Sequence, residues 1–311
     1  MRLDDPEALR RIGELAIPPA WTEVWICPDP MGHLQATGLD AAGRKQYLYH
    51  ERWRMHRDRE KFERMLRFGS GLPRLRRRIS RRLSGDQLEY ERVIACAVRL
   101  LDIGMFRVGN TEYAEDDGGV GLATVGKRHV TVNGRLIAFD YPAKGGARRV
   151  QHIEDAACAV VVHALKGRRR GGPQLFAYRD AGRWRNLRAE DINAYLKREL
   201  GDEFTAKDFR TWNATVMTAV ALATDGRDAS SRTARQRHIK RAVRAVAELL
   251  GNTPAVARRS YIDPRVFDCY LAGLTISSAV QAVGDLDVSS DRVRNRIERA
   301  VVALLADWGT G

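Results

Sequence analysis

The sequence lacks the features of membrane proteins and of disulfide-stabilised secreted proteins. Its first 21 residues contain no apolar segment of the secretory-signal type, and the longest apolar-rich run, Ala156 to Leu165, is far too short to span a bilayer. Cys27, Cys96, Cys158 and Cys269 occur singly with no close pair, so neither a zinc ribbon nor a disulfide-stapled secreted fold is indicated. We therefore expect a soluble, cytoplasmic protein with reduced, buried thiols.

Two kinds of catalytic motif are also missing. No phosphate loop of the Gly-x4-Gly-Lys-Ser/Thr type occurs, so the sequence shows no site for ATP hydrolysis. The nearest approaches to a metal-binding acidic cluster are residues 115–117 (Glu-Asp-Asp) and 285–287 (Asp-Leu-Asp), which lie among turn formers and read better as loops or helix entries. These absences disfavour a metal-dependent nuclease, and we expect no metal and no cofactor.

What the sequence has in excess is positive charge. Its 53 Lys and Arg residues outnumber 39 Asp and Glu residues, which gives a formal net charge of +14 and a pI near 10.0. Such a surplus indicates a polyanionic partner, nucleic acid first and a membrane surface second. With 311 residues, 44% of them hydrophobic, the chain is long enough to bury a real core in one large domain or two ordinary ones.

The N-terminal part has the pattern of a small β-rich module. Short β signals at residues 22–27 are followed by a strongly charged helical stretch at residues 51–68. An arginine-rich run at residues 74–82 then leads to Ser84-Gly85, and we place a domain boundary near Leu83. The sequence predicts an α+β protein with a small β-rich N-terminal domain at residues 1–83 and a larger, mainly helical domain at residues 84–311.

The larger domain is predicted to contain a small sheet among helices. A helix is expected around residues 94–101, and strands are expected at residues 120–125, 129–133 and 135–141, the last two joined by a type I′ turn at Asn133-Gly134. From residue 153 onward nearly everything is predicted to be helical. Three helix-end signals support this prediction: a capping box at Thr205 and Asp208, a helix end at Gly251, and a helix start at Thr253-Pro254.

Five polar residues form an ordered series along this larger domain. They are Arg107 in Phe-Arg-Val-Gly-Asn, Lys144 in Pro-Ala-Lys-Gly-Gly, Arg210 in Lys-Asp-Phe-Arg-Thr-Trp, Asn252, and Tyr261 in Arg-Arg-Ser-Tyr-Ile-Asp-Pro. The series resembles the catalytic residues of type IB DNA topoisomerases, in particular the compact poxvirus-like enzymes found in bacteria. Residues 43–49 (Gly-Arg-Lys-Gln-Tyr-Leu-Tyr) resemble that family's DNA-clamping segment, so the resemblance covers almost the whole chain.

Phosphodiester chemistry explains why these residue types are needed. Displacing a 5′-oxygen places negative charge on the phosphate oxygens, which the forked guanidinium groups of Arg107 and Arg210 are suited to stabilise. A tyrosine such as Tyr261 is a poor nucleophile at neutral pH unless nearby cations favour its phenolate. The leaving alkoxide needs a general acid, for which Lys144 is the candidate, as the resemblance also implies. Asn252 stands where one familiar version of the pattern has histidine; its amide can donate a hydrogen bond to phosphate but cannot relay a proton.

Each of these residues also has an ordinary structural interpretation. An arbitrary tyrosine is usually a half-buried amphipathic side chain, and Arg107 or Arg210 alone would most often pair with a carboxylate. Lys144 on a glycine-rich turn would most often be a solvated charge. Asn252, between two predicted helices, also fits a local helix cap. It is their joint occurrence in this order that favours a catalytic site.

Further residues are candidates for DNA contact. Tyr47 and Tyr49 lie two residues apart on a predicted strand, so they share a face with which, together with Arg44, the protein can contact phosphates and base edges. The alternative is an exposed aromatic pair that stiffens a sheet. Arg258 adds positive charge beside Tyr261. The basic runs at residues 74–82 and 166–170 could follow the DNA backbone, although most such runs are solvated faces.

The resemblance implies a fold shared with tyrosine recombinases and a reaction on double-stranded DNA. Tyr261 would form a 3′-phosphotyrosyl intermediate and free a 5′-hydroxyl, without ATP or a metal, in a monomeric, nucleoid-associated enzyme. A tyrosine recombinase is the nearest alternative, but residues 44–49 and the β signals suit a topoisomerase clamp better than the helical core-binding domain of recombinases. A non-catalytic, basic DNA-binding protein is the alternative from another class, since composition alone would suffice for it.

Overall fold

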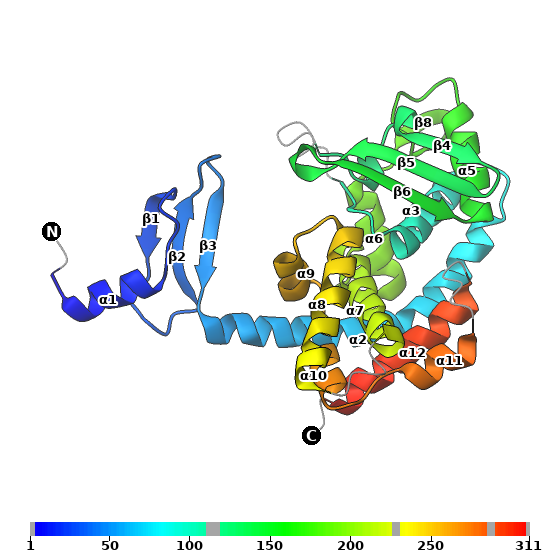
Figure 1. Ribbon diagram of the computed structural model, residues 1–311. Helices are drawn as coiled ribbons and strands as arrows, with labels where there is room; N and C mark the ends of the chain where they lie inside the picture. The colour runs from blue at the N-terminus through cyan, green and yellow to red at the C-terminus, as the bar shows by residue number, and fades with distance from the viewer. Residues whose placement is uncertain (1–3, 110–118, 226–230, 285–289, 309–311) are drawn as a thin grey trace. The chain divides into compact units, whose positions relative to one another are not determined.

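The computed structural model describes residues 4–109, 119–225, 231–284 and 290–308 (Figure 1). The chain forms two units, Met1–Arg64 and Met65–Gly311. This division lies earlier than the boundary expected near Leu83. The reason is helix α2 (Glu51–Leu83), which runs through the expected linker and whose C-terminal half belongs to the core of the second unit.

The N-terminal unit is a three-stranded antiparallel sheet with one short helix, as the β signals predict. The strands lie in the order β1-β2-β3. Arg11 of the helix donates to Gln35 Oε1 at 2.8 Å, and Gln35 in turn donates to three carbonyls of the β1–β2 loop. The elements are α1 (Pro6–Glu14), β1 (Thr22–Ile26), β2 (Leu34–Leu39), β3 (Lys45–Tyr49) and the first part of α2.

The C-terminal half of α2 carries an apolar stripe into the second unit. Its buried members recur every three or four residues, which places them on one helical face; they are Met65, Phe68, Leu72, Leu75, Ile79 and Leu83. Gly69 does not end the helix but lets it approach α7, since a Cβ there would lie 2.3 Å from the Trp212 ring. Sequence patterning could not reveal that this glycine serves packing.

The arginine run at residues 74–82 is more structural than the sequence suggested. Arg76 is 1% exposed, and Arg78 and Arg82 both bind the carboxylate of Glu199. Arg74, Arg77 and Arg81 are exposed on the other face. Those three exposed side chains are therefore the members of the run most accessible to a polyanion.

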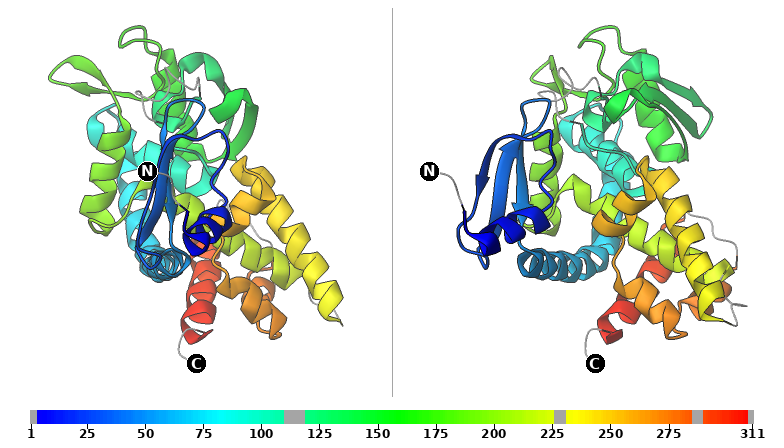
Figure 2. Two further views of the ribbon diagram at one scale, coloured as in Figure 1. Left: turned by 90° about the vertical axis from the view of Figure 1, so that its left-hand side faces the viewer. Right: turned by 60° about the vertical axis from the view of Figure 1, so that its left-hand side comes forward.

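The second unit places helices around a core beneath a small sheet (Figures 1 and 2). Strands β4, β5 and β6 form an antiparallel sheet, α5 packs on β4 and β5, and α8 pairs with both α7 and α9. The helices are α3 (Tyr90–Gly104), α5 (Ala156–Gly167), α6 (Ala189–Leu200), α7 (Ala206–Asp225), α8 (Arg232–Leu250), α9 (Pro254–Ser260), α10 (Arg265–Leu271), α11 (Ser277–Val283) and α12 (Asp291–Trp308). The strands are β4 (Val130–Asn133), β5 (Leu136–Pro142), β6 (Arg148–Glu154), β7 (Ala177–Asp180) and β8 (Arg183–Asn186), with short 3₁₀ turns at Leu122–Thr124, Lys127–His129 and Lys144–Gly146.

Local predictions in this unit were partly confirmed. Gly251 ends α8 in the left-handed conformation, and Thr253 and Pro254 begin α9 as expected. The strand predicted at residues 120–125 was wrong, because Leu122–Thr124 is a 3₁₀ turn, and the β7–β8 hairpin interrupts the region expected to be helical. The β4–β5 hairpin exists, but Asn133 pairs with Leu136, so Gly134 and Arg135 form the turn; a positive φ at Gly134 alone excludes type I′.

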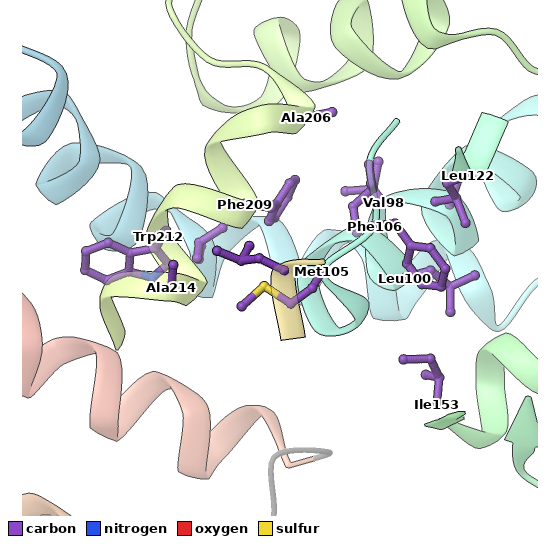
Figure 3. Packing of buried hydrophobic residues seen from close by; sticks show 14 of the residues in the cluster. Val98, Leu100, Met105, Phe106, Leu122, Ile153, Ala206, Phe209, Trp212 and Ala214 are labelled. Atoms are coloured by element: carbon purple, nitrogen blue, oxygen red, sulfur yellow. The ribbon is translucent and has the colours of Figure 1, made fainter. Parts of the chain in front are cut away.

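The core joins the end of α3 to α7. In Figure 3, Met105 lies between Phe209 and Trp212 of α7 and the group around Phe106. Phe106 packs edge-on against Phe139 of β5 at 4.9 Å between ring centroids. The chain segment that follows α3 is therefore held between the helices and the sheet.

A buried ion network anchors the same end of α3. The Asp102 carboxylate accepts from Arg76 Nε at 2.9 Å and from Arg294 Nη1 at 2.7 Å, and Glu298 accepts from Arg76 Nη2 at 2.7 Å. Burial opposes ionisation of Asp102, but the charges of Arg294 and Arg76 hold its pKa far below the ordinary value. Asn213 of α7 donates to Asp102 O at 2.8 Å. Helices α2, α3, α7 and α12 are thus tied together directly behind the segment that carries Arg107.

Three of the four thiols are buried, as expected. Cys96, Cys158 and Cys269 are buried, whereas Cys27 is half-exposed, and none is in a disulfide. Among the described residues, the structure contains no helix that is both long and apolar enough to cross a membrane.

Candidate active site

Arg107, Arg210 and Asn252 meet in the second unit, although they are far apart in sequence. Arg107 Nη2 donates to Asn252 Oδ1 at 2.7 Å, and Arg210 Nη2 donates to the same oxygen at 3.4 Å. With its oxygen facing two guanidinium groups, Asn252 directs its NH₂ group elsewhere as a hydrogen-bond donor. Thr253 Oγ1, not the Asn252 side chain, caps α9 by accepting from Val256 N. The Asn252 side chain therefore does not cap the N-terminus of α9.

Arg107 is placed by a close crossing of two backbone segments. Helix α3 ends at Met105 in the left-handed conformation, with φ of 55°, which turns the chain toward the sheet. Leu122 N then donates to Arg107 O at 2.8 Å. Gly109 and Gly121 pass so closely that a Cβ on Gly121 would lie 2.3 Å from Gly109 N, so both positions need glycine.

Arg210 is fixed on the first turns of α7. The predicted capping box is present in part, since Thr205 N donates to Asp208 Oδ2 at 2.7 Å. Arg210 is 3% exposed, and its guanidinium donates to Met105 O and, at 2.9 Å, to Leu250 O. Its Nε has no hydrogen-bond partner within the described part of the chain. A buried donor without a partner costs free energy, so this nitrogen is a ready site for an incoming oxyanion.

Tyr261 lies next to Arg210. It follows the last residue of α9, its N–H donates to Ala257 O at 3.1 Å, and its ring centroid is 5.2 Å from the Arg210 guanidinium carbon. Thr215 of α7 holds the following turn, because Asp263 N donates to Thr215 Oγ1 at 3.0 Å. The phenol is therefore held beside a cation by contacts on both sides.

The charges around Tyr261 favour its phenolate. Burial opposes ionisation, but the positive charges of Arg210 and Arg107, together with that of Lys207, lower the pKa of Tyr261. Burial, together with the repulsion of Arg107, lowers the pKa of Arg210 to about 10, which still leaves it protonated at neutral pH. The site thus combines an activated phenol with permanent positive charge.

The hairpin that carries Lys144 borders the same site. Ala143 N donates to Ala147 O at 2.8 Å, which closes a tip at Lys144–Gly146 between β5 and β6, at the glycine-rich turn expected from the sequence. Gly145 and Gly146 both have positive φ, so the Gly-Gly pair is required by the turn. A cavity of about 260 Å³ lies between this hairpin, Arg107, Arg210 and the end of α8.

Arg149 and Tyr141 line this cavity but were not candidates from the sequence. They face each other across β5 and β6, and Arg149 donates to Leu249 O at the end of α8. A basic residue five positions after Lys144 was visible in the sequence. Its direction, however, depends on the strand register, which the sequence analysis did not establish.

The predicted DNA-contact residues of the N-terminal unit lie together on its sheet. The Tyr47 and Tyr49 rings stack at 6.2 Å, which confirms that they share a face, and Tyr49 stacks on Trp53 of α2 at 4.4 Å. Arg44 lies just before β3 and binds Asp40 through Nε at 3.0 Å. Trp53, which extends the aromatic row, was missed because it lies on a helix.

The remaining candidates have mixed outcomes. Arg258 is exposed on α9, where its guanidinium lies over the Phe267 ring at 4.4 Å. In the basic run at residues 166–170, Lys166 donates to Val130 O and Arg168 is buried among carbonyls, so those two residues serve the fold. The acidic residues 115–117 and 285–287 lie outside the described residues. Within the described residues, no three His, Cys, Asp or Glu side chains are grouped as metal ligands would be.

Comparison with known proteins places the chain in one family. Residues 50–301 match the family model for the catalytic core of eukaryotic DNA topoisomerase I, and residues 1–40 match the model for the N-terminal domain of bacterial DNA topoisomerase IB. The DNA topoisomerase 1B of Acanthamoeba polyphaga mimivirus is 30% identical over 269 residues, which span 84% of this chain and 80% of the viral protein. DNA topoisomerase I of monkeypox virus and DNA topoisomerase 1B of vaccinia virus are each 21% identical over 85% of this chain and 82% of their own length.

The matched region covers both arginines, the hairpin, Asn252 and Tyr261. The separate match at residues 1–40 lies within the N-terminal unit, Met1–Arg64. The chain therefore belongs to the type IB topoisomerases and is a DNA topoisomerase, an isomerase that acts on DNA.

Proposed function

We propose that this enzyme relaxes supercoiled double-stranded DNA by cutting one strand with Tyr261 and then resealing it. The observation that carries the proposal is the placement of the Tyr261 ring 5.2 Å from the Arg210 guanidinium carbon, with Arg107 and Asn252 bound to one another beside it. This arrangement combines an activated nucleophile with donors for a phosphate group.

In the proposed cleavage step, Tyr261 releases its phenolic proton to solvent water and its oxygen attacks the scissile phosphorus. A bond from phosphorus to the tyrosine oxygen forms while the bond from phosphorus to the 5′-oxygen breaks, which gives a 3′-phosphotyrosyl enzyme. Arg107, Arg210 and Asn252 stabilise the charge on the phosphate oxygens. Lys144 donates the proton that makes the leaving group a 5′-hydroxyl.

Religation is the reverse of this attack, after the cut duplex has rotated. The phosphotyrosyl bond conserves the free energy of the phosphodiester, so the cycle needs no ATP. Every role in it is filled by a side chain, and we propose that no metal ion takes part.

Plasmid relaxation in EDTA without ATP tests this function. The enzyme is expected to relax supercoiled plasmid and to leave a covalent protein–DNA adduct when the reaction is quenched with detergent. Loss of single-turnover cleavage in EDTA that magnesium restores would contradict the metal-free mechanism. Exchange between paired sites would indicate a recombinase, and binding without relaxation would indicate a non-catalytic DNA-binding protein.

Lys144→Ala tests the general acid. The variant is expected to cleave an ordinary duplex roughly 10²- to 10⁴-fold more slowly than the wild type, because the 5′-alkoxide must leave without a proton. It should recover most of that rate on a duplex whose scissile 5′-oxygen is replaced by sulfur, since a thiolate leaves unprotonated. Single-turnover rates on both substrates give the comparison, and equal defects on the two would assign Lys144 to charge stabilisation instead.

We propose that the N-terminal domain contributes to DNA binding and that the enzyme closes around the duplex as a monomer. The support is the row of Tyr47 and Tyr49 of β3 and Trp53 of α2, with Arg44 directly before β3. Aromatic edges and a guanidinium suit contact with base edges and phosphates together. Arg258, exposed one turn before Tyr261, is a further proposed phosphate contact.

Arg44→Ala tests this contact. If Arg44 neutralises one phosphate, the variant should bind duplex DNA more weakly, and the slope of log affinity against log salt should become shallower by about one unit. Arg185→Ala is a matched control, because Arg185 is similarly exposed and is also held by an aspartate, Asp180. Titrations of both variants over a salt series decide the matter: weaker binding with an unchanged slope would mean that Arg44 contacts a base edge or supports the fold.

A further inference from the structure

Arg149 occupies a place in the site that none of these roles uses. It is the second residue of β6, and it lines the cavity shared by Arg107 and Arg210. Its Nη2 donates to Leu249 O, and a Cβ on Gly251 would lie 2.5 Å from its Nη1. The side chain therefore extends from the base of the Lys144 hairpin to the helix end that precedes Asn252.

The hairpin is held at two places in the described structure. On one side, Tyr141 Oη donates to Gln151 Oε1 at 2.7 Å, and Gln151 Nε2 donates to Gly104 O at the end of α3. On the other side, Arg149 holds the hairpin to the end of α8. Together these contacts fix the base of the hairpin relative to the backbone on both sides of the site.

The end of α8 is also the point where the catalytic arginine is fixed. Leu250 O accepts from Arg210 Nη2 at 2.9 Å, one residue after the carbonyl that accepts from Arg149. One short stretch, residues 249–252, thus contacts both Arg149 and Arg210 and supplies the Asn252 side chain. A shift of the hairpin relative to this stretch would change the distance between its tip and the bound phosphate.

The same contacts argue against a direct role for Arg149 on the phosphate. Its Nη2 is engaged by the Leu249 carbonyl, and a Cβ on Gly251 would lie 2.5 Å from its Nη1, so the guanidinium is directed at the end of α8. Arg149 follows the Lys144–Gly146 tip by only a few residues. Gly145 and Gly146 give that tip its turn, so Arg149 holds the base of the hairpin and not the tip. Arg149 is thus better placed to fix the hairpin than to bind the substrate.

We propose that Arg149 is a positioning residue: by joining the base of the hairpin to the end of α8, it sets Lys144 at the 5′-oxygen of the phosphate bound by Arg107, Arg210 and Asn252. This inference rests on the proposed function and deepens the role given there to Lys144. Precise placement of a catalytic group by such supporting contacts commonly decides its rate.

The sulfur-substituted duplex tests this role. Arg149→Ala is expected to cleave the ordinary duplex roughly 10- to 100-fold more slowly than the wild type, and the sulfur-substituted duplex within about threefold of it, because only the ordinary duplex needs the acid. The double variant with Lys144→Ala should be no more than about twofold slower than Lys144→Ala alone, since residues that act through one another are not additive. Arg149→Lys should be nearly as slow as Arg149→Ala, because it keeps the charge but loses the guanidinium fork.

Arg148→Ala is the matched control. Arg148 is the adjacent residue on the same strand, but it is exposed and pairs with Asp140 at 2.6 Å, so its removal should leave both rates within about twofold. Any one of three results would overturn the inference. Arg149→Ala could slow both substrates equally, its effect could add to that of Lys144→Ala in the double variant, or it could cleave the ordinary duplex at the wild-type rate. Failure of the proposed function would look different, since the wild type itself would give no adduct or Lys144→Ala would show no recovery on sulfur.

Discussion

Replacing Tyr261 by phenylalanine is expected to abolish the covalent adduct and plasmid relaxation, a loss of at least roughly 10⁴-fold in cleavage rate, because the attacking oxygen is removed. DNA affinity should remain close to that of the wild type. Tyr261 is 8% exposed within the core cluster, and phenylalanine retains that packing. Adduct formation on an end-labelled duplex, followed on a denaturing gel, measures the effect.

Tyr270→Phe provides the control for this experiment. Tyr270 is also a buried tyrosine, 4% exposed on the neighbouring α10, and its hydroxyl lies 3.1 Å from His238 Nδ1. Its replacement removes the same atom from a nearby helix and should leave adduct formation unchanged. A normal adduct yield from Tyr261→Phe would refute Tyr261 as the nucleophile, whatever the control does.

Arg210→Lys should lower the single-turnover cleavage rate by roughly 10²- to 10³-fold, the scale expected for removing a preorganised donor from developing oxyanion charge. The variant keeps a positive charge, but a lysine cannot donate to Met105 O and Leu250 O at once and still present a further N–H to phosphate. Cleavage measured at saturating enzyme separates this effect from weaker DNA binding.

Arg235→Lys is the matched control, since Arg235 also donates to a carbonyl at a helix end, Leu271 O, but lies outside the proposed site. It should cleave at the wild-type rate. Thermal melting of both variants shows whether either has lost its fold. If Arg210→Lys is folded and cleaves within about threefold of the wild type, charge alone suffices and the preorganised fork has no role.

The geometry also explains why asparagine is acceptable where one version of the pattern has histidine. The Asn252 oxygen accepts from Arg107 and Arg210, so it orders the two guanidinium groups that would otherwise repel each other. The proposed role needs an oxygen that accepts from the two arginines and an N–H group that donates to the phosphate. An amide supplies both at any pH near neutrality. A proton relay is not required in the proposed mechanism, because Lys144 supplies the proton.

The sequence alone supplied the proposed chemistry and the order of the residues that would carry it. Arg107, Lys144, Arg210, Asn252 and Tyr261 are recognisable from their local contexts, and the ends of α8 and α9 follow from Gly251, Thr253 and Pro254. These signals are local, since caps, turns and motif contexts depend on a few neighbouring residues. The α+β class and the basic character follow from pattern and composition for the same reason.

Only the tertiary structure decided features that depend on distant contacts. The close approach of α2 to α7 at Gly69 depends on Trp212, more than a hundred residues later, and the burial of Arg76 depends on Asp102 and Glu298. In the sequence Arg149 cannot be told from many other arginines. The register of β5 and β6 and the bond to Leu249 O show where its side chain lies. Contacts between segments far apart in the chain leave no periodic or local signal in the sequence. Only the folded chain shows that Arg107 and Arg210 share Asn252 Oδ1 as an acceptor, and only there does the role proposed for Arg149 become visible.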